Sequence, residues 1–351
     1  PVRVNHSGLS TVSTDTGSWH TCAITENGSV ACWGINFEGQ IGSDSEIGSP
    51  DPVFIEGYNS SHKAVSIRSG TYHSCAIDTN GNVRCWGQGT EGQLGDGSSS
   101  NSLIPVNVSL PNGVKAIDVA LGNEHTCALL TNGSVSCWGT GTWGQLGAGL
   151  SLSSSSTPVL TDQLGQTGRT AIALTSGSSH TCAILDDRSL VCWGYNGYGA
   201  LGIGSYTNMY SPTYVQSLTS GSSVNVTSVE AGVSHTCAIL SSGASCWGIG
   251  SSGELGNGYT TNLAYPTTVN SFGTGVNAVE IVAGWSHSCA LLNTGNISCW
   301  GNGLYGVLGD NTSNSSLSPK PSFAIPTNDS IIELSSRNVH TCALTDNNST
   351  W

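Results

Sequence analysis

Histidine and cysteine are the residues of this chain whose types and spacing could do chemistry. The 351 residues include nine histidines and thirteen cysteines, and imidazole and thiolate side chains are the usual ligands of Zn²⁺. The spacing argues against a metal site, because no Cys-x-x-Cys occurs and each repeated histidine lies two residues from a cysteine on the same strand face, with no fourth ligand within reach. We predict no metal site and no cofactor.

Seven of the histidines belong to a repeated phrase, His-Thr/Ser-Cys-Ala. They are His20, His73, His125, His180, His235, His287 and His340, at spacings of 53, 52, 55, 55, 52 and 53 residues. Because every copy places its histidine at the same point, we expect a buried, hydrogen-bonded structural residue. A ring of these histidines binding a metal in a central channel is the alternative. His6 and His62 lie outside the repeat and have no evident partner.

Twelve cysteines form six pairs that face each other across short hairpins. In the first copy, pairing Cys22 with Cys32 also pairs Ile24 with Val30 and leaves a three-residue loop ending in Gly28, which suits a type I turn followed by a left-handed glycine. Facing residues are close enough for a disulfide, so we predict six: Cys22–Cys32, Cys75–Cys85, Cys127–Cys137, Cys182–Cys192, Cys237–Cys246 and Cys289–Cys299. Cys342 has no partner within the chain. Paired thiols argue for an oxidising compartment.

The elements that carry these hairpins are short strands. Each full copy continues into Cys-Trp-Gly, a Gly-x-Leu/Ile-Gly turn, a polar loop and a Pro/Val-rich stretch, with no helical periodicity. Four strands per unit and seven units predict an all-β, seven-bladed β-propeller forming a single domain over residues 1–351. The expected repeats are 11–56, 62–110, 113–164, 168–218, 223–272, 275–325, and 329–351 completed by 1–4.

The repeat resembles the regulator of chromosome condensation repeat family over essentially the whole chain. The resemblance is carried by Gly-x-x-His-Thr-x-Ala-Leu and by Trp-Gly-x-x-x-x-Gly-Gln-Leu-Gly, as in Gly92–Gly95 and Gly144–Gly147. It implies a closed seven-bladed ring. The best-known member is a nuclear guanine-nucleotide exchange factor that also binds nucleosomes, and relatives include a secreted bacterial inhibitor of β-lactamases and many extracellular proteins. The repeat therefore defines the scaffold and leaves the activity open.

The seventh copy stops early. The partner of Cys342 would fall at position 352, whereas the sequence ends at Trp351, and Pro1–Val4 resembles the Pro/Val strand that closes a repeat. We expect the N-terminal strand to complete the seventh blade beside the C-terminal strands, which would remove an open edge. The missing Cys-Trp-Gly has two explanations: the native polypeptide continues, which we favour, or another chain fills the gap by strand addition.

Charge and hydropathy exclude two classes of partner. Charged residues are 9% of the chain, and 22 acidic against 9 basic residues give a formal net charge of −13. Lys and Arg are too few, and the net sign wrong, for nucleic-acid binding. No run of 18 apolar residues occurs, so we expect no membrane insertion.

Glycosylation sequons agree with an extracellular or cell-surface location. They are Asn5, Asn27, Asn59, Asn107, Asn132, Asn225, Asn296, Asn311, Asn314, Asn328, Asn347 and Asn348. We expect covalent N-glycans on several of them, with Asn27, Asn132 and Asn296 the best candidates because they occupy similar hairpin positions. The alternative is chance, because a chain rich in Asn, Ser and Thr produces such sequons by composition alone.

No catalytic residue is nominated by spacing. The acids are scattered and several lie at hairpin turns, where carboxylates form turns or are solvated, although two from different blades could meet unseen. The off-pattern aromatics, by contrast, are possible partner contacts: Trp19, Trp143, Trp285, Tyr206 and Tyr210. Packing between loops is the alternative role for them.

These observations predict a non-enzymatic extracellular or cell-surface scaffold that binds through propeller rim loops, whose lengths vary on a constant framework. Its preferred form is the subunit of a surface filament or coat, with protein partners that include copies of itself. The alternatives are a secreted protein-binding inhibitor or receptor-like module, and a propeller lyase or glycan-active enzyme.

Overall fold

The computed structural model describes residues 10–111, 113–149, 152–165, 169–219, 221, 223–322 and 330–351. Short antiparallel strands dominate, and each runs until a turn rich in Gly, Asn or Ser ends it. The first three blades are built from β1 (Thr11–Thr16), β2 (His20–Thr25), β3 (Val30–Gly34) and β4 (Ser49–Phe54); β5 (Ala64–Ser69), β6 (His73–Asp78), β7 (Val83–Gly87) and β8 (Ser102–Asn107); and β9 (Ala116–Leu121), β10 (His125–Leu130), β11 (Val135–Thr140) and β12 (Ser154–Leu160).

The remaining strands follow the same order, and one short 3₁₀ helix, η1 (Leu304–Gly306), lies in blade 6. Blades 4 to 6 are built from β13 (Ala171–Ser176), β14 (His180–Leu185), β15 (Leu190–Gly194) and β16 (Met209–Tyr214); β17 (Val226–Ala231), β18 (His235–Leu240), β19 (Gly243–Gly248) and β20 (Leu263–Thr268); and β21 (Ala278–Ala283), β22 (His287–Leu292), β23 (Ile297–Gly301) and β24 (Ser316–Pro321). The chain ends in β25 (Ile331–Arg337) and β26 (His340–Thr345).

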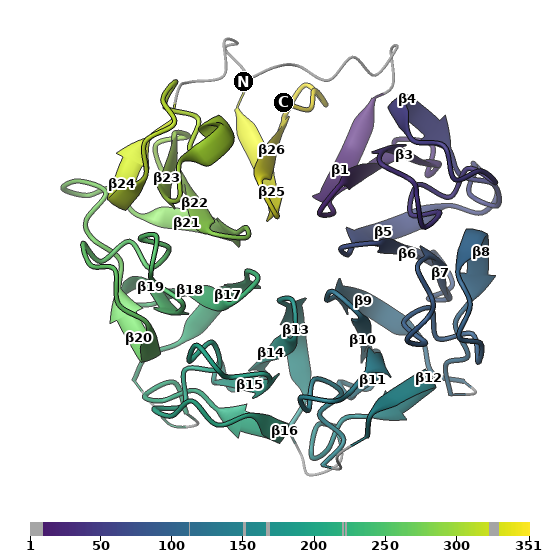
Figure 1. The fold of residues 1–351 in the computed structure, drawn as a ribbon, viewed down its shortest axis with the longest axis horizontal. Coiled ribbons are helices and arrows are strands. Elements are labelled where there is room, and N and C mark those ends of the chain that lie inside the picture. Colours follow the sequence, from purple (N-terminus) through teal and green to yellow (C-terminus); the bar gives the residue numbers. More distant parts are fainter. Residues whose placement is uncertain are drawn as a thin grey trace.

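The sheets stand around a central axis as the blades of a propeller (Figure 1). The first strand of each blade lies innermost and the fourth lies at the rim. The core lies between neighbouring blades, where clusters such as Cys75, Leu94 and Trp138 combine side chains of two successive units. One blade cannot bury both of its faces, so the ring supplies what a single repeat lacks.

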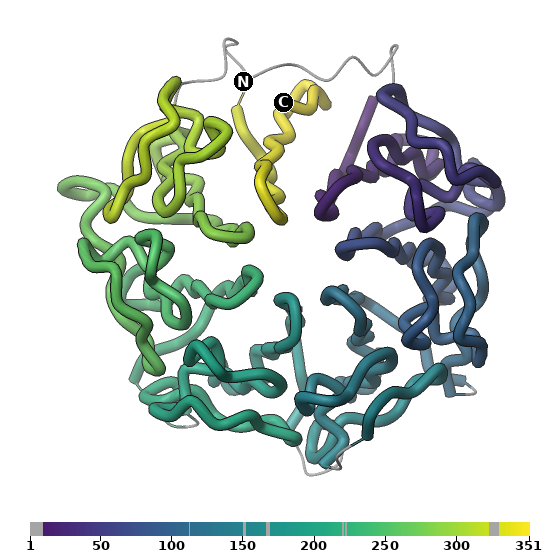
Figure 2. Tube along the Cα trace, in the orientation of Figure 1, coloured from purple at the N-terminus to yellow at the C-terminus, as the bar shows by residue number. Residues whose placement is uncertain are grey.

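The prediction of seven four-stranded blades is wrong for the described residues, which form six four-stranded blades and one two-stranded sheet, β25–β26. That sheet lies between blade 6 and blade 1 (Figure 2). Thr350 and Trp351 pair with Leu344 and Ala343, in the register that third strands take elsewhere. Among the described residues, no third or fourth strand joins this sheet beyond these pairs. The expected closure by residues 1–4 lies outside the described residues.

The hairpin register predicted from the first copy is confirmed. Cys22 pairs with Cys32 and Ile24 with Val30, and Gly28 adopts the left-handed φ of +83° that the turn needs. The structure contains all six disulfides, with Cα–Cα distances of 4.0 to 4.1 Å. Cys342 is a free thiol, and burial raises its pKa to about 12.

The first six repeated histidines join neighbouring sheets. His73 Nε2 lies 2.8 Å from Thr126 Oγ1 of the next blade, and that hydroxyl donates to the carbonyl of Gln93 at 2.9 Å. The Trp138 indole donates to the same carbonyl at 2.9 Å. Because Thr126 gives its proton to Gln93, it must accept one from His73, so Nε2 of His73 carries a proton. Burial lowers the pKa of His73 well below its usual value, which keeps the ring neutral. These histidines are therefore structural.

The glycine three residues before each of the first six histidines makes room for the ring. A Cβ added to Gly122 would lie 2.1 Å from His125 Cε1, which no side chain could tolerate. Burial lowers the pKa of His125 to about 3 and that of His180 to about 4, so both are neutral at pH 7.

Candidate functional site

The strand register defines two faces of the propeller. His20 pairs with Gly34, which in turn pairs with Ser49, so the turn before His20 and the long loop between β3 and β4 lie at the same end of the blade. All six blades repeat this arrangement. We call this end the loop face, made of residues 17–19 and 35–48 and their equivalents. The opposite end, made of the hairpin turns such as 26–28 and the links between blades, is the hairpin face.

Exposed aromatic side chains gather on the loop face. Apart from Phe54 and Tyr265 on rim strands, every strongly exposed aromatic of the described chain lies in a turn or loop of this face: Trp19, Phe37, Trp143, Tyr198, Tyr206, Tyr259, Trp285 and Tyr305. Single exposed apolar residues need no explanation, but aromatic groups gathered on one face mark a recognition surface.

The tightest group of these aromatics bridges blades 3 and 4. The Trp143 and Tyr195 rings meet edge to face with centroids 5.6 Å apart, and Tyr195 meets Tyr198 at 6.2 Å. The Tyr210 hydroxyl donates to the Thr142 carbonyl. Rings fixed by their neighbours lose little entropy on contact with a partner.

The predicted partner contacts lie in three settings. Trp143 and Tyr206 are exposed in loops, whereas Tyr210 is half-buried on the rim strand β16. Trp19 and Trp285 are about half exposed in turns on either side of the two-stranded sheet. There the side chain of Asn338 donates to the Ser18 carbonyl, and Asn338 accepts from the Trp285 amide at 2.8 Å.

The loop face is poor in basic residues. Among its described loops and turns, Arg337, at the position equivalent to Gly17, is the one Lys or Arg, and its guanidinium extends into the central channel. The acids of this face are Glu38, Asp44, Glu46, Glu91, Asp96, Glu124, Glu254 and Asp310. The sequons lie mostly on the other face. Asn27, Asn132, Asn296, Asn347 and Asn348 occupy hairpin turns, Asn59, Asn107 and Asn225 lie beside blade links, and Asn311 and Asn314 lie in a loop-face loop. Asn5 and Asn328 lie outside the described residues.

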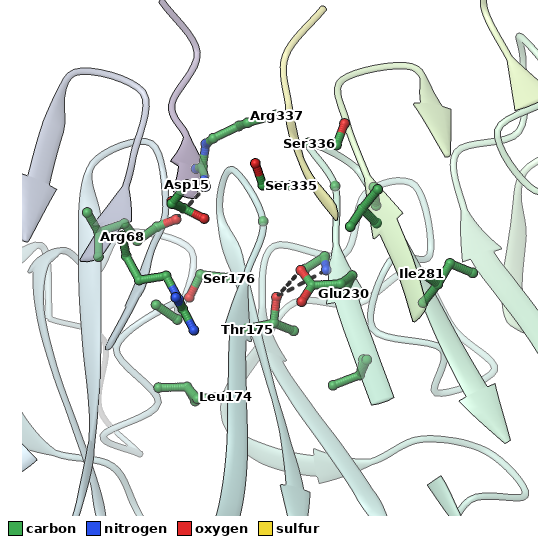
Figure 3. A pocket seen from close by; sticks show the side chains of 18 of the residues that line it. Asp15, Arg68, Leu174, Thr175, Ser176, Glu230, Ile281, Ser335, Ser336 and Arg337 are labelled. Carbon is green, nitrogen blue, oxygen red and sulfur yellow. Dashed lines mark hydrogen bonds between the residues drawn. The ribbon is translucent and has the colours of Figure 1, made fainter. Parts of the chain in front are cut away.

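A cavity of about 320 Å³ occupies the central channel. Figure 3 shows Asp15, Arg68, Glu230 and Arg337 extending into it from four different sheets, and Thr175 donating to Glu230 at 3.2 Å. Arg68 forms an ion pair with Asp118 at 3.2 Å. Acids that are far apart in the sequence therefore lie together in this channel, because the sheets are arranged around one axis.

Three of the channel carboxylates fasten their own inner strand to that of the following sheet. Asp15 accepts from the amide of Ser69, Glu280 from that of Leu334, and Glu333 from that of Thr14, each on the following sheet. Burial raises the pKa of Asp15 to about 6 and those of Glu230 and Glu280 to about 7. Through these contacts the acids position neighbouring inner strands.

Sequence reasoning missed this channel, although the signal was present. Asp15, Arg68 and Glu230 all stand five residues before a repeated histidine, so alignment of the repeats would have put them in one ring. Arg337 likewise stands where the six other copies have glycine. Their contacts, however, join strands from different blades, which no single repeat reveals.

The described part of the chain lacks a metal-binding cluster and a membrane-spanning helix. Within it, no group of three or more His, Cys, Asp or Glu side chains is placed to hold a metal ion. Within the same residues, no helix has the length and apolar character needed to cross a membrane.

Comparison with curated proteins finds relatives that match most of this chain. It is 30% identical over 339 residues to the ultraviolet-B receptor UVR8 of Arabidopsis thaliana, which covers 95% of this chain and 74% of UVR8. It is also 30% identical over 300 residues to the E3 ubiquitin-protein ligase HERC2 of Homo sapiens, covering 85% of this chain but 6% of HERC2.

Solved structures share the fold. Human WBSCR16 superposes with a TM-score of 0.83 at 21% identity, covering 96% of this chain and 86% of that one. Prp20p of Saccharomyces cerevisiae, described with its binding to Gsp1p and histones, has a TM-score of 0.82 at 23% identity and covers 98% and 85%. The ectodomain of the Arabidopsis thaliana receptor kinase ACR4 has a TM-score of 0.56 at 17% identity and covers 98% and 95%.

Family models match nearly the whole repeat region. Residues 1–274 match the RCC1-like domain, and residues 278–307 match the regulator of chromosome condensation (RCC1) repeat. Together with the blade architecture and the 30% identity to UVR8, these matches show that the chain belongs to the RCC1-like family of β-propellers.

Proposed function

We propose that this protein is a non-enzymatic, extracellular or cell-surface interaction scaffold that binds protein partners through its loop face. The observation that carries the proposal is the gathering of exposed aromatics in the loops of that face, away from most sequons. Variable loops on a rigid framework are the usual place for binding residues. The description of Prp20p with Gsp1p and histones supports protein binding as a use of this fold.

The disulfides support the proposed location. Six disulfides between adjacent strands require an oxidising environment to form and persist. The ACR4 ectodomain is an example of this fold outside the cell. Glycans on Asn27, Asn132 and Asn296 would lie on the hairpin face and leave the loop face open to a partner.

The preferred form of the scaffold is a subunit of a surface filament or coat. A chain with 9% charged residues and one disulfide in each complete blade suits a durable assembly whose surface is covered by neutral polar groups. Light scattering and electron microscopy of native material test this form. A strictly monomeric species would favour the inhibitor or receptor-like alternative.

The enzyme alternative has a specific location to test. Carboxyls with pKa values near neutrality can act as general acids or bases, and Glu230 and Glu280 lie in the channel wall. Their present contacts, a threonine hydroxyl and a backbone amide, position strands. Turnover in a hydrolase and lyase screen that is lost in Glu230→Gln would replace the scaffold proposal.

The scaffold proposal is tested by capture from native extract with matched variants. Trp143→Ser with Tyr198→Ser removes two loop-face aromatics, while Phe54→Ser with Tyr265→Ser removes two equally exposed rim aromatics as the control. We expect the loop-face variant to capture its partner about tenfold less or weaker still, because removal of aromatic anchors has an effect of this size. The control variant should capture the partner as the unaltered protein does. Equal capture by both variants and the unaltered protein would refute binding through the loop face.

A further inference from the structure

Every innermost strand has a β-bulge at its second residue. In β1, Thr11 pairs with Thr25 and Ser13 with Ile24, so Val12 is the extra residue, and the same shift recurs in all seven sheets. The bulged residues are Val12, Val65, Ile117, Ile172, Thr227, Val279 and Ile332. We call them the bulge ring. They lie toward the hairpin face, at the opposite end of the channel from the loop-face turns.

The bulge ring exposes aliphatic side chains that would ordinarily be buried. Its six aliphatic members are 41 to 58% exposed, whereas the residue on either side of Val12 is more buried. A bulge re-aims the extra side chain out of the strand's alternation, and seven bulges repeat that effect around one axis. A ring of apolar side chains exposed to water is the kind of surface that marks a binding site for a partner.

Three members of the ring share a cavity with charged groups. This second cavity measures about 470 Å³, a size typical of ligand sites. Its lining includes Val65, Ile117, Ile172, Ser13, Ser66, Arg68, Asp118 and Glu333. These three ring members therefore form the apolar wall of a cavity, and residues that directly follow bulge residues, such as Ser66 and Asp118, provide its polar side.

Carboxylates outnumber cations in the channel behind the ring. Asp118 pairs with Arg68, but Glu280 and Glu333 accept only neutral donors among the hydrogen bonds described for them. Arg337 lies at the far end, where its Nη1 donates to the Leu121 carbonyl. A ligand entering past the bulge ring therefore meets more carboxyl groups than guanidinium groups. Burial raises the pKa of Glu280 to about 7, and a cation bound beside it would favour its charged form.

Buried hydroxyls in the channel lack partners. Thr16 Oγ1 and Ser335 Oγ make no hydrogen bond, although Thr16 is 2% and Ser335 7% exposed, and both residues line the channel cavity. Ser66 Oγ, in the second cavity, is also unpaired. Unpaired buried hydroxyls are costly and are satisfied by a ligand with hydrogen-bonding groups.

We propose that the bulge ring and the carboxylates behind it bind a polypeptide segment in which Lys or Arg lies between aliphatic residues. The aliphatic side chains of the segment cover the ring, and its cation reaches Glu280 and Glu333. Peptide N–H and C=O groups are available for the unpaired hydroxyls. This site lies at the opposite end of the channel from the loop face, so it is independent of the function proposed above.

The binding test uses three short labelled peptides and the whole protein. The Lys probe is acetyl-Gly-Leu-Lys-Leu-Gly-amide; the Glu probe replaces its Lys by Glu, and the Ser probe replaces both Leu by Ser. By fluorescence anisotropy, we expect the Lys probe to bind about tenfold more tightly than either control and to weaken as salt is raised. Equal affinity of the Lys and Glu probes, or no binding of the Lys probe at about 1 mM, would overturn the proposal.

Variants locate the binding. Ile117→Ser with Ile172→Ser should weaken the Lys probe about tenfold, and Glu280→Gln, which keeps an oxygen for the Leu334 amide, should weaken it severalfold. Ile104→Ser with Leu160→Ser removes exposed aliphatics from rim strands and should change nothing. Thermal unfolding checks that each variant is folded. Undiminished binding to the folded Ile117 and Ile172 variant would also refute the proposed site.

Discussion

Arg337 donates a hydrogen bond from Nη1 to the Leu121 carbonyl at 2.7 Å, across the central channel from the two-stranded sheet to blade 3. Six repeats have glycine at the position of Arg337, because the histidine ring of their own repeat needs the space. In the seventh copy the turn differs, with Asn338 at a φ of +52°. Among the described residues, the His340 ring makes no hydrogen bond to the next blade of the kind seen for His73. The hydrogen bond from Arg337 to Leu121 therefore helps to hold the seventh sheet, in place of a histidine bond to the next blade.

Loss of Arg337 should loosen that sheet. We expect Arg337→Ala to lower the free energy of unfolding by about 1.5–3 kcal/mol, the usual value of a hydrogen bond that involves a charged group. Amide exchange should accelerate in β25 and β26 more than in blade 3. Lys115→Ala, at an exposed position in a blade link, is the control. Exchange that rises equally in all blades would contradict this local role.

The Thr126 hydroxyl, which bonds residues of two blades, should contribute more to stability than a hydroxyl on an exposed loop. Thr126→Val removes the acceptor of His73 Nε2–H and one of the two donors to Gln93 O, leaving a buried N–H unpaired. We expect a loss of roughly 1–3 kcal/mol in urea unfolding. Thr90→Val, on an exposed loop, should change stability by less than about 0.5 kcal/mol. Equal effects of the two variants would show that the inter-blade contact adds nothing.

Each disulfide should stabilise its blade. Replacing Cys127 and Cys137 together by Ala opens a loop of sequence separation 10, for which chain entropy predicts a loss of about 3 kcal/mol, less any native-state strain relieved. Denaturant unfolding under non-reducing conditions measures it. The single variant Cys342→Ala, at the free thiol, is the control for changing a cysteine without breaking a bond. A double variant as stable as the control would indicate that the crosslink is redundant.

Acid should destabilise the fold through the histidines. Burial lowers the pKa of all seven repeat histidines, so the unfolded chain binds more protons than the native one from about pH 6.5 downward. The buried carboxyls act oppositely, because their raised pKa values let the native state bind more protons between about pH 7 and 4. The seven histidines outnumber these carboxyls, so we expect the free energy of unfolding to decrease as the pH is lowered.

The decline should steepen below about pH 4.5, where the carboxyls no longer oppose it, at about 1.4 kcal/mol per pH unit for each net proton taken up. Urea unfolding at about pH 6.5, 5.5 and 4 measures this dependence. Stability that rises steadily down to pH 4 would mean that the carboxyls, not the histidines, dominate.

The sequence determined the blade by itself. The Cys22–Cys32 pairing, the turn at Gly28 and the repeat spacing near 53 residues predict strands, register and disulfides, because each of these contacts forms within a single hairpin. The repeat count also predicted seven complete blades, whereas in the described residues the last copy forms a sheet of two full strands.

Only the tertiary structure decided how the blades meet. It joined His73 to Thr126 of the next blade, gathered Asp15 and Glu230 in one channel, and turned the bulge ring toward the hairpin face. These residues are about 50 to more than 200 positions apart, and ring closure alone brings them together. Their contacts depend on the angle and order of neighbouring sheets, which no pattern within one repeat encodes.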